Sequence, residues 1–330
     1  MQELRQDPVT GRWVVIAPIR GKRPKEYEQT PKPLPSITAE ECPFCPGNEH
    51  LTPPEVYAVR DVDSEPDKPG WQIRVVPNKF PAFSQNPSPL NDSHSFIKRA
   101  AFGYHEVVIH SPRHDEEISA MPVERLVKLI EVYKLRCVQI GSDPNIKYVH
   151  IIVNHGVESG ASLEHAHSQI FGLPLVPEGL QDELGGSLWF SQSKERCVFC
   201  WMLEEEMKTG QRVLFENTHF LAVAPFASRF PFEIWLLPKR HSPSFETVKQ
   251  GEIGDLAHTI SKVISAYNCK LGNPSYNFFI HTAPCDGSDY HYFHWHAEVF
   301  PRISSLGAFE LGTQIMINPT APERAVELLS

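Results

Sequence analysis

Hydrophobic and polar positions along the chain repeat in two blocks of the same design. Each block has a strand-like apolar stretch, a segment with apolar residues at helical spacing, a short β-branched or aromatic run, and a second strand-like stretch. In the first block these segments cover residues 106–114, 123–135, 148–154 and 165–174, and in the second they cover 233–241, 253–267, 276–282 and 294–302. The pattern therefore predicts a unit of strand, helix, strand and strand that occurs twice.

The same order extends to short motifs. A Cys-x-x-Cys pair precedes each block, an Arg-His ends its first strand, and a His-x-His begins its last one. Five matched elements predict a duplicated α+β unit of about 150 to 180 residues. We therefore divide the chain into residues 1–180 and 181–330, with the Pro-, Gly- and Ser-rich stretch 175–187 as the join.

Composition narrows the class of protein. The chain has 330 residues, of which 41% are hydrophobic, so it is long enough to bury a large core. Its formal net charge of -9 argues against nucleic acid as a partner, because clustered Lys and Arg supply most of the affinity for phosphate backbones. No apolar run approaches the roughly 20 residues of a membrane span. We expect a globular cytoplasmic protein that uses no membrane.

The cysteine pairs and the histidines suggest metal sites. Each block supplies two thiols and two imidazoles, and a closed set of four such ligands is typical of structural zinc. A single pair would leave redox-active or simply buried cysteines equally open, but the repetition of the full set favours metal. Two zinc ions per chain are predicted, with iron possible at either site. The ligand sets are Cys42, Cys45, His114 and His165, and Cys197, Cys200, His241 and His294.

The second histidine of the first His-x-His pair has no ligand duty. Residues i, i+2 and i+4 of a strand share a face, so His167 and Gln169 point the same way as His165. A neutral imidazole is a good nucleophile toward phosphorus near pH 7. Ser162, the turn amides around Gly160 and the amide of Gln169 are suited to holding phosphate oxygens. The alternative is a buried histidine that only supports the metal ligand.

Three segments carry a resemblance to a known family. "NHGVESGASLEHAHSQIFGLP", "DPVTGRWVVIAPIRGKRP" and "GAFELGTQIMIN" resemble the galactose-1-phosphate uridylyltransferase family of the histidine-triad superfamily, from about Arg5 to Asn318. The resemblance implies a duplicated histidine-triad-like fold with two mainly antiparallel sheets flanked by helices. It also implies a homodimer and a ping-pong reaction in which UDP-glucose nucleotidylates a histidine and galactose 1-phosphate accepts the nucleotide.

Carried over to this chain, the resemblance makes His167 the nucleophile and gives Gln169 and Ser162 phosphate contacts. It places Asn78 and Asn154 in the nucleotide pocket. Four further residues are implied to reach across the dimer, namely Arg20, Arg23, Phe309 and Glu310.

Some positions depart from the pattern. His-Ala-His-Ser-Gln at residues 165–169 and the preceding Ala161 and Leu163 resemble a plant branch that acts as an ADP-glucose phosphorylase, with phosphate as acceptor. In the second block, Glu298 stands where the first has Gln169, and a carboxylate repels a phosphate. We therefore expect one active centre per chain. The sequence favours a uridylyltransferase, with the phosphorylase as the alternative. A third interpretation is a zinc-stabilised nucleotide-binding module without activity.

Overall fold

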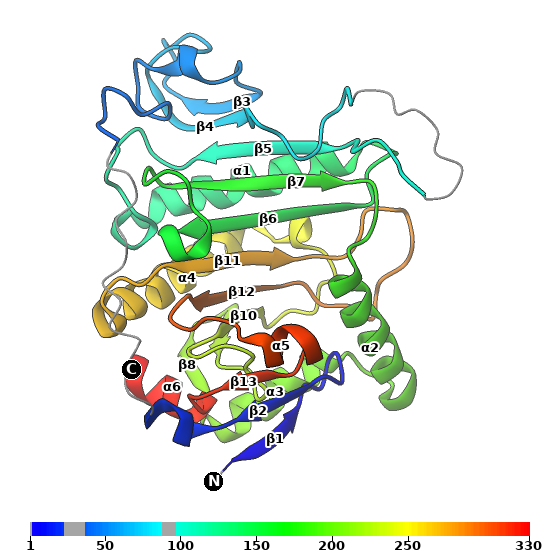
Figure 1. The fold of residues 1–330 in the computed structure, drawn as a ribbon. Helices are drawn as coiled ribbons and strands as arrows, with labels where there is room; N and C mark the ends of the chain where they lie inside the picture. Colours follow the sequence, from blue (N-terminus) through cyan, green and yellow to red (C-terminus); the bar gives the residue numbers. More distant parts are fainter. Residues whose placement is uncertain (1, 23–36, 88–96) are drawn as a thin grey trace.

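A ten-stranded antiparallel sheet runs through the computed structural model, which describes residues 2–22, 37–87 and 97–330 (Figure 1). Its strands, in spatial order, are β3 (Tyr57–Arg60), β4 (Trp71–Pro77), β5 (Tyr104–Ile109), β7 (His167–Leu173), β6 (Tyr148–His155), β11 (Tyr276–His281), β12 (His296–Pro301), β10 (Ile234–Pro238), β9 (Phe220–Val223) and β8 (Val213–Glu216).

The duplication is visible in this order. On one side of the central pair β6–β11 lie β7, β5, β4 and β3, and on the other side lie β12, β10, β9 and β8. The two copies of the predicted unit are β5–α1–β6–β7 and β10–α4–β11–β12. They join edge to edge, with Asn154 opposite Asn277 in the central pair. The expected α+β class with mainly antiparallel sheets is confirmed, and the two copies share the larger sheet.

Helices α1 (Val123–Gly141) and α4 (Gln250–Leu271) cover one face of this sheet, the face that is turned away from the viewer in Figure 1. Both helices contain the segments predicted from helical spacing and extend beyond them. Their buried side chains, such as Leu126 and Ile130 on α1 and Leu256 and Ile260 on α4, join the largest apolar cluster of the described residues. The strands contribute every second residue to this cluster, so the intervening residues point to the opposite face.

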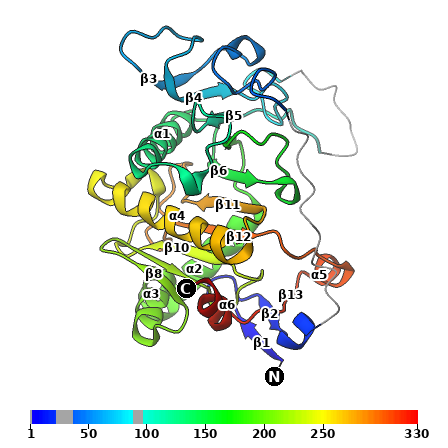
Figure 2. The same cartoon turned by 90° about the vertical axis from the view of Figure 1, so that its left-hand side faces the viewer.

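The opposite face holds the polar chemistry. Figure 2 shows the molecule from the side, where a small sheet of β1 (Glu3–Gln6), β2 (Trp13–Ile16) and β13 (Met316–Asn318) stands apart from the large one. The helices α5 (Ala308–Thr313) and α6 (Pro322–Leu329) flank it, and α2 (Glu178–Lys194) and α3 (Val198–Thr209) pack on the second copy. The pairing of β2 with β13 brings both ends of the chain together.

Most of the predicted join lies in a helix. Residues 178–187, with their three glycines, form the first part of α2. Gly186 has a packing role, because a Cβ there would lie 1.7 Å from the carbonyl oxygen of Val9. The division at residue 180 stays a prediction. No helix within the described ranges is long and apolar enough to cross a bilayer.

Candidate functional site

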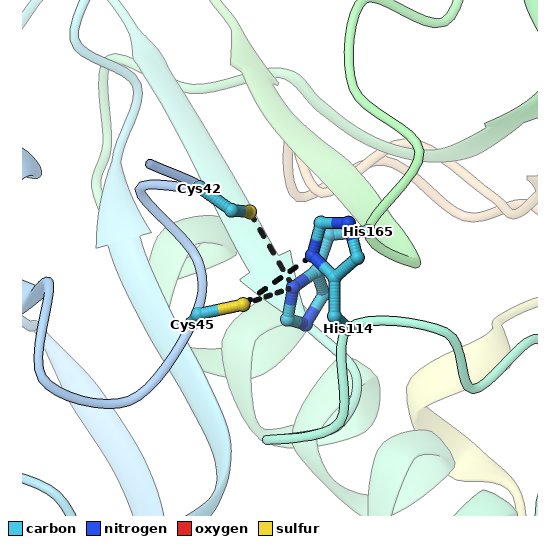
Figure 3. Close-up of side chains that lie close together, drawn as sticks. All are labelled: Cys42, Cys45, His114 and His165. Carbon is cyan, nitrogen blue, oxygen red and sulfur yellow. Dashed lines mark hydrogen bonds between the residues drawn. The ribbon is translucent and has the colours of Figure 1, made fainter. Parts of the chain in front are cut away.

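The first predicted ligand set comes together on the face opposite α1. Cys42 and Cys45 lie in the loop before β3, His114 follows β5, and His165 directly precedes β7 (Figure 3). The Sγ atom of Cys45 is 3.3 Å from Nδ1 of His114 and 3.5 Å from Nδ1 of His165. The Sγ atom of Cys42 is 3.6 Å from the same nitrogen of His165. All four candidate ligand atoms lie within 4.8 Å of one another.

These separations fit a tetrahedral ion. Zinc–sulfur bonds of about 2.3 Å and zinc–nitrogen bonds of about 2.05 Å at the tetrahedral angle place sulfur about 3.6 Å from nitrogen. The observed sulfur–nitrogen distances of 3.3 to 3.6 Å lie within about 0.3 Å of that value. The donor set of two thiols and two imidazoles is also the one that zinc prefers. The residues present therefore fit zinc.

Protonation supports the same assignment. The Nε2 atom of His165 lies 2.8 Å from the carbonyl oxygen of Ser111, so it carries the proton and leaves the Nδ1 lone pair toward the sulfurs. Burial lowers the pKa of His165 to about 4, which keeps the imidazole neutral. Burial, followed by the charge of Cys42, raises the pKa of Cys45 to about 12. A bound cation would favour loss of the Cys45 proton near neutral pH.

The second predicted set repeats this arrangement on the other copy. The Sγ atom of Cys200 is 3.4 Å from Nδ1 of His241 and 3.6 Å from Nδ1 of His294, and Cys197 is 3.9 Å from the latter nitrogen. The Nε2 atom of His241 donates to the carbonyl oxygen of His291 at 2.8 Å. This set is less enclosed, since only His294 is fully buried. Its geometry also fits a tetrahedral ion.

His167 is oriented by its own strand. Its Nδ1 atom donates to the carbonyl oxygen of His165 at 2.9 Å, and the ring edge packs against Phe44, whose centroid is 5.2 Å away. The Nε2 atom meets no hydrogen-bond partner in the described part of the chain, while the residue keeps 7% of its surface exposed. Burial lowers the pKa of His167, so the ring is neutral near pH 7. A free nucleophilic lone pair results.

Gln169 and Asn78 meet beside this histidine through a residue that the sequence patterns did not single out. The Nε2 atom of His105, on β5, lies 2.6 Å from Oε1 of Gln169 and 3.1 Å from Nδ2 of Asn78. Asn78 directly follows β4, and its backbone N–H donates to the carbonyl oxygen of His105 at 2.8 Å. The two residues expected to contact the substrate are thus neighbours.

Asn154, Gly160 and Ser162 are the other predicted contacts in the described part of the first copy. Asn154, on β6, accepts a hydrogen bond of 2.7 Å from Nδ2 of Asn277. Gly160 has a φ of 89°, and a Cβ there would lie 4.0 Å from Nδ2 of Asn154. Gly160 and Ser162 are both exposed. Asn154 and His167 line one pocket. Contact of Gly160 and Ser162 with a ligand at His167 stays a prediction.

The remaining predicted contacts are not brought to His167. Arg20 lies in the short 3-10 turn Pro18–Lys22 after β2, and Phe309 and Glu310 lie on α5. In Figure 1 this helix and β2 lie at the end of the molecule opposite β3 and β4. Phe309 is 47% exposed. Arg23 lies outside the described residues.

The second copy of His-x-His is built differently. The Nε2 atom of His296 faces Oε1 of Glu298 at 3.5 Å, and the rings of Phe199 and Trp235 lie with centroids 4.8 and 5.0 Å away. His296 is completely buried. The nitrogen that corresponds to the free one of His167 is therefore turned toward a carboxylate.

A third cluster was missed by sequence reasoning. Glu183 of α2 and His281 of β11 join His296 and Glu298, and their candidate ligand atoms lie within 4.8 Å of one another. Arg229 also pairs with Glu298. The charges of Glu183 and Glu298 raise the pKa of His281 against the opposing effect of its burial. Glu183 lies in the stretch 175–187, which the sequence analysis treated only as the join between the copies, so no pattern there indicated a functional side chain.

Known proteins share this architecture over the whole chain. Residues 1–177 match the family described as galactose-1-phosphate uridyl transferase, N-terminal domain, and residues 163–327 match its C-terminal domain. The chain is 36% identical to an ADP-glucose phosphorylase of Arabidopsis thaliana, over 99% of this chain and 92% of the relative. It is 31% identical to a galactose-1-phosphate uridylyltransferase of Thermotoga maritima, over 100% and 98%. The crystal structure of the Arabidopsis thaliana ADP-glucose phosphorylase with bound ADP-glucose superposes with a TM-score of 0.85 at 35% identity, covering 100% of this chain and 98% of the other. The resemblance predicted from the sequence is confirmed.

Proposed function

Because the chain belongs to the galactose-1-phosphate uridyl transferase family, an enzyme family of hexose-1-phosphate nucleotidyltransferases, we propose that it transfers a nucleoside monophosphate through His167. The observation that carries this proposal is the state of that side chain. Its ring is neutral, its Nδ1–H is held by the carbonyl of His165, and its Nε2 lone pair is free.

The first half-reaction forms one bond and breaks one. Nε2 of His167 attacks the α-phosphorus of a nucleotide sugar, and the bond from that phosphorus to the oxygen shared with the β-phosphate breaks. The hexose 1-phosphate leaves with the electron pair of that bond. The Nδ1–H bond to the carbonyl of His165 stabilises the positive charge that develops on the ring.

The second half-reaction reverses these steps with a new acceptor. A phosphate oxygen of the acceptor attacks the same phosphorus, and the nitrogen–phosphorus bond breaks to return the free imidazole. Gln169 donates its amide hydrogens to the phosphate oxygens, and the turn around Gly160 and Ser162 supplies further donors. No external oxidant or base is consumed, because a phosphate acceptor attacks through an oxygen that is already ionised.

The Cys/His clusters hold the scaffold of this centre. We assign zinc to each, with iron as the other metal that the ligands accept. In the first cluster, bound metal would fix His165 and thereby the start of β7, on which His167 and Gln169 stand two residues apart. Its contribution is structural and electrostatic, since four protein ligands leave no open position.

Of the two donor–acceptor pairs, we propose ADP-glucose with phosphate as the first candidate. Identity to the ADP-glucose phosphorylase is 36%, compared with 31% to the uridylyltransferase, and it extends over nearly the whole chain. UDP-glucose with galactose 1-phosphate, the pair expected from the sequence, is the second candidate because the family's name and the fold apply equally to it.

We also propose one centre per chain and a homodimer. Glu298 and the aromatic rings around His296 support a silent second copy. In Figure 1, α5 and β2 lie in the half of the molecule that holds the second copy, away from β7, and this placement supports a dimer in which Arg20, Arg23, Phe309 and Glu310 serve the partner's centre.

A matrix of substrates tests the proposal. Purified protein is incubated with ADP-glucose or UDP-glucose, each with phosphate or galactose 1-phosphate, and the products are separated by chromatography. We expect turnover with ADP-glucose and phosphate and none for His167→Gly. Turnover with UDP-glucose and galactose 1-phosphate alone would reverse the order of the two candidates. Turnover with none of the four pairs would leave the nucleotide-binding module as the better description.

A further inference from the structure

His105 lies between the residues that the reaction uses and is itself held on three sides. Its Nδ1 atom accepts the backbone N–H of Ala82 at 3.0 Å. Its ring stacks on Phe171 with centroids 4.1 Å apart and planes at 24°. Its carbonyl oxygen accepts the N–H of Asn78. The Ala82 N–H and the Phe171 ring thus hold the side chain of His105, and the Asn78 N–H anchors its backbone.

These contacts also determine where its proton lies. The Ala82 N–H is a donor, so Nδ1 must present its lone pair and the neutral ring must carry its hydrogen on Nε2. Burial lowers the pKa of His105, which favours this neutral form. The Nε2–H then needs an acceptor, and the nearest atom is Oε1 of Gln169 at 2.6 Å.

The nearby Asn78 is not that acceptor. Its Oδ1 atom accepts the backbone N–H of Phe80 at 2.8 Å, so its Nδ2 atom faces His105 and has only hydrogens to offer. Two donors do not bond to each other. The hydrogen bond from His105 therefore goes to Gln169.

We propose that His105 is a positioning residue that fixes the amide orientation of Gln169, so that the NH₂ group and not the carbonyl oxygen faces the phosphate of the nucleotide. Without it, the Gln169 amide is free to turn over and present its oxygen, which repels a phosphate. The inference rests on the proposed function, because it assigns a task within that reaction.

Three single variants and one double variant separate hydrogen bonding from packing. His105→Phe keeps a ring on Phe171 and removes the donor, whereas His105→Gln keeps a terminal N–H near the position of Nε2. Gln169→Ala removes the group on which His105 acts, and the double variant His105→Phe/Gln169→Ala completes a cycle. The probe is ADP-glucose or UDP-glucose labelled at the α-phosphate, whichever nucleotidylates the wild-type chain, mixed in rapid-quench single-turnover experiments. Zinc content and melting temperature serve as controls for folding.

We expect His105→Phe to slow nucleotidylation by about ten- to a hundredfold, as loss of a supporting contact does, and to change the concentration for half-saturation less than threefold. His105→Gln should recover most of the rate, and the double variant should be no slower than Gln169→Ala. Wild-type rates for His105→Phe, or an additive loss in the double variant, would overturn the role of His105. If the wild-type chain takes up no label from either nucleotide sugar, the proposed function fails instead.

Discussion

Replacing Gln169 by glutamate, the residue type found at the corresponding position 298 of the second copy, tests whether a negative charge beside the phosphate slows the reaction. Gln169→Glu keeps the length of the side chain and the acceptor for His105, but it replaces an NH₂ donor by a carboxylate oxygen. A carboxylate about 4 Å from a phosphate charge is repelled by about 4 kcal/mol at an effective dielectric constant of about 20. That energy corresponds to a rate about a thousandfold lower.

Gln169→Ala is the matched control, because it removes the donor without adding charge, for an expected loss of about a hundredfold or more. The assay follows release of hexose 1-phosphate in a single turnover at saturating nucleotide sugar. Gln169→Glu should be at least about tenfold slower than Gln169→Ala, since a flexible carboxylate recovers part of the repulsion by turning away. Equal rates, or a faster Gln169→Glu, would refute the placement of Gln169 against the phosphate.

Three further predictions concern metal, protonation and the inactive copy. Cys42→Ala and Cys200→Ala should each remove about one of two zinc ions per chain and several kcal/mol of stability, and a folded wild-type chain without metal by elemental analysis would contradict this. Burial lowers the pKa of His150 to about 3, so its ring binds a proton more readily in the unfolded chain. The contribution of neutral His150 to the free energy of unfolding is therefore complete above pH 6.5 and is lost as the pH falls. Between pH 7.5 and pH 5 urea unfolding should therefore show a loss about 2 kcal/mol smaller in His150→Phe than in the wild type, and equal losses would exclude His150 as the source. Glu298→Gln should leave the amount of bound nucleotide at one per chain, and a rise to two would show that charge alone silences the second copy.

Much of the fold follows from local patterns. The helical spacing of 123–135 and 253–267 and the apolar runs that became β6 and β11 were sufficient to predict the repeated unit. Periodicity does not report which strand edges meet, so the joining of the copies through β6 and β11 into one sheet required the structure. The helix α2 was not predicted from the sequence, because the contact of Gly186 with Val9 leaves no signal in a single sequence.

The site, like the fold, could be predicted only in part from the sequence. The Cys/His clusters assembled as predicted because repeated ligand types at repeated spacing constrain both copies together. His105 was missed, since its task depends on a backbone amide from residue 82 and on the strand beside its own. Glu183 and His281 come together only because α2 packs against the second copy. Contacts between distant segments leave no signature in composition or period.

The covalent intermediate is the most direct test of the account. Wild-type protein is mixed with ADP-glucose, and in parallel with UDP-glucose, without acceptor, and is then analysed by intact-mass and peptide mass spectrometry under alkaline conditions, where phosphohistidine persists. The account predicts one nucleoside monophosphate per chain on the peptide that contains His167, none in His167→Gly, and loss of the adduct when the acceptor is added. An unmodified wild-type chain with both nucleotide sugars, or an adduct at a residue other than His167, would contradict it.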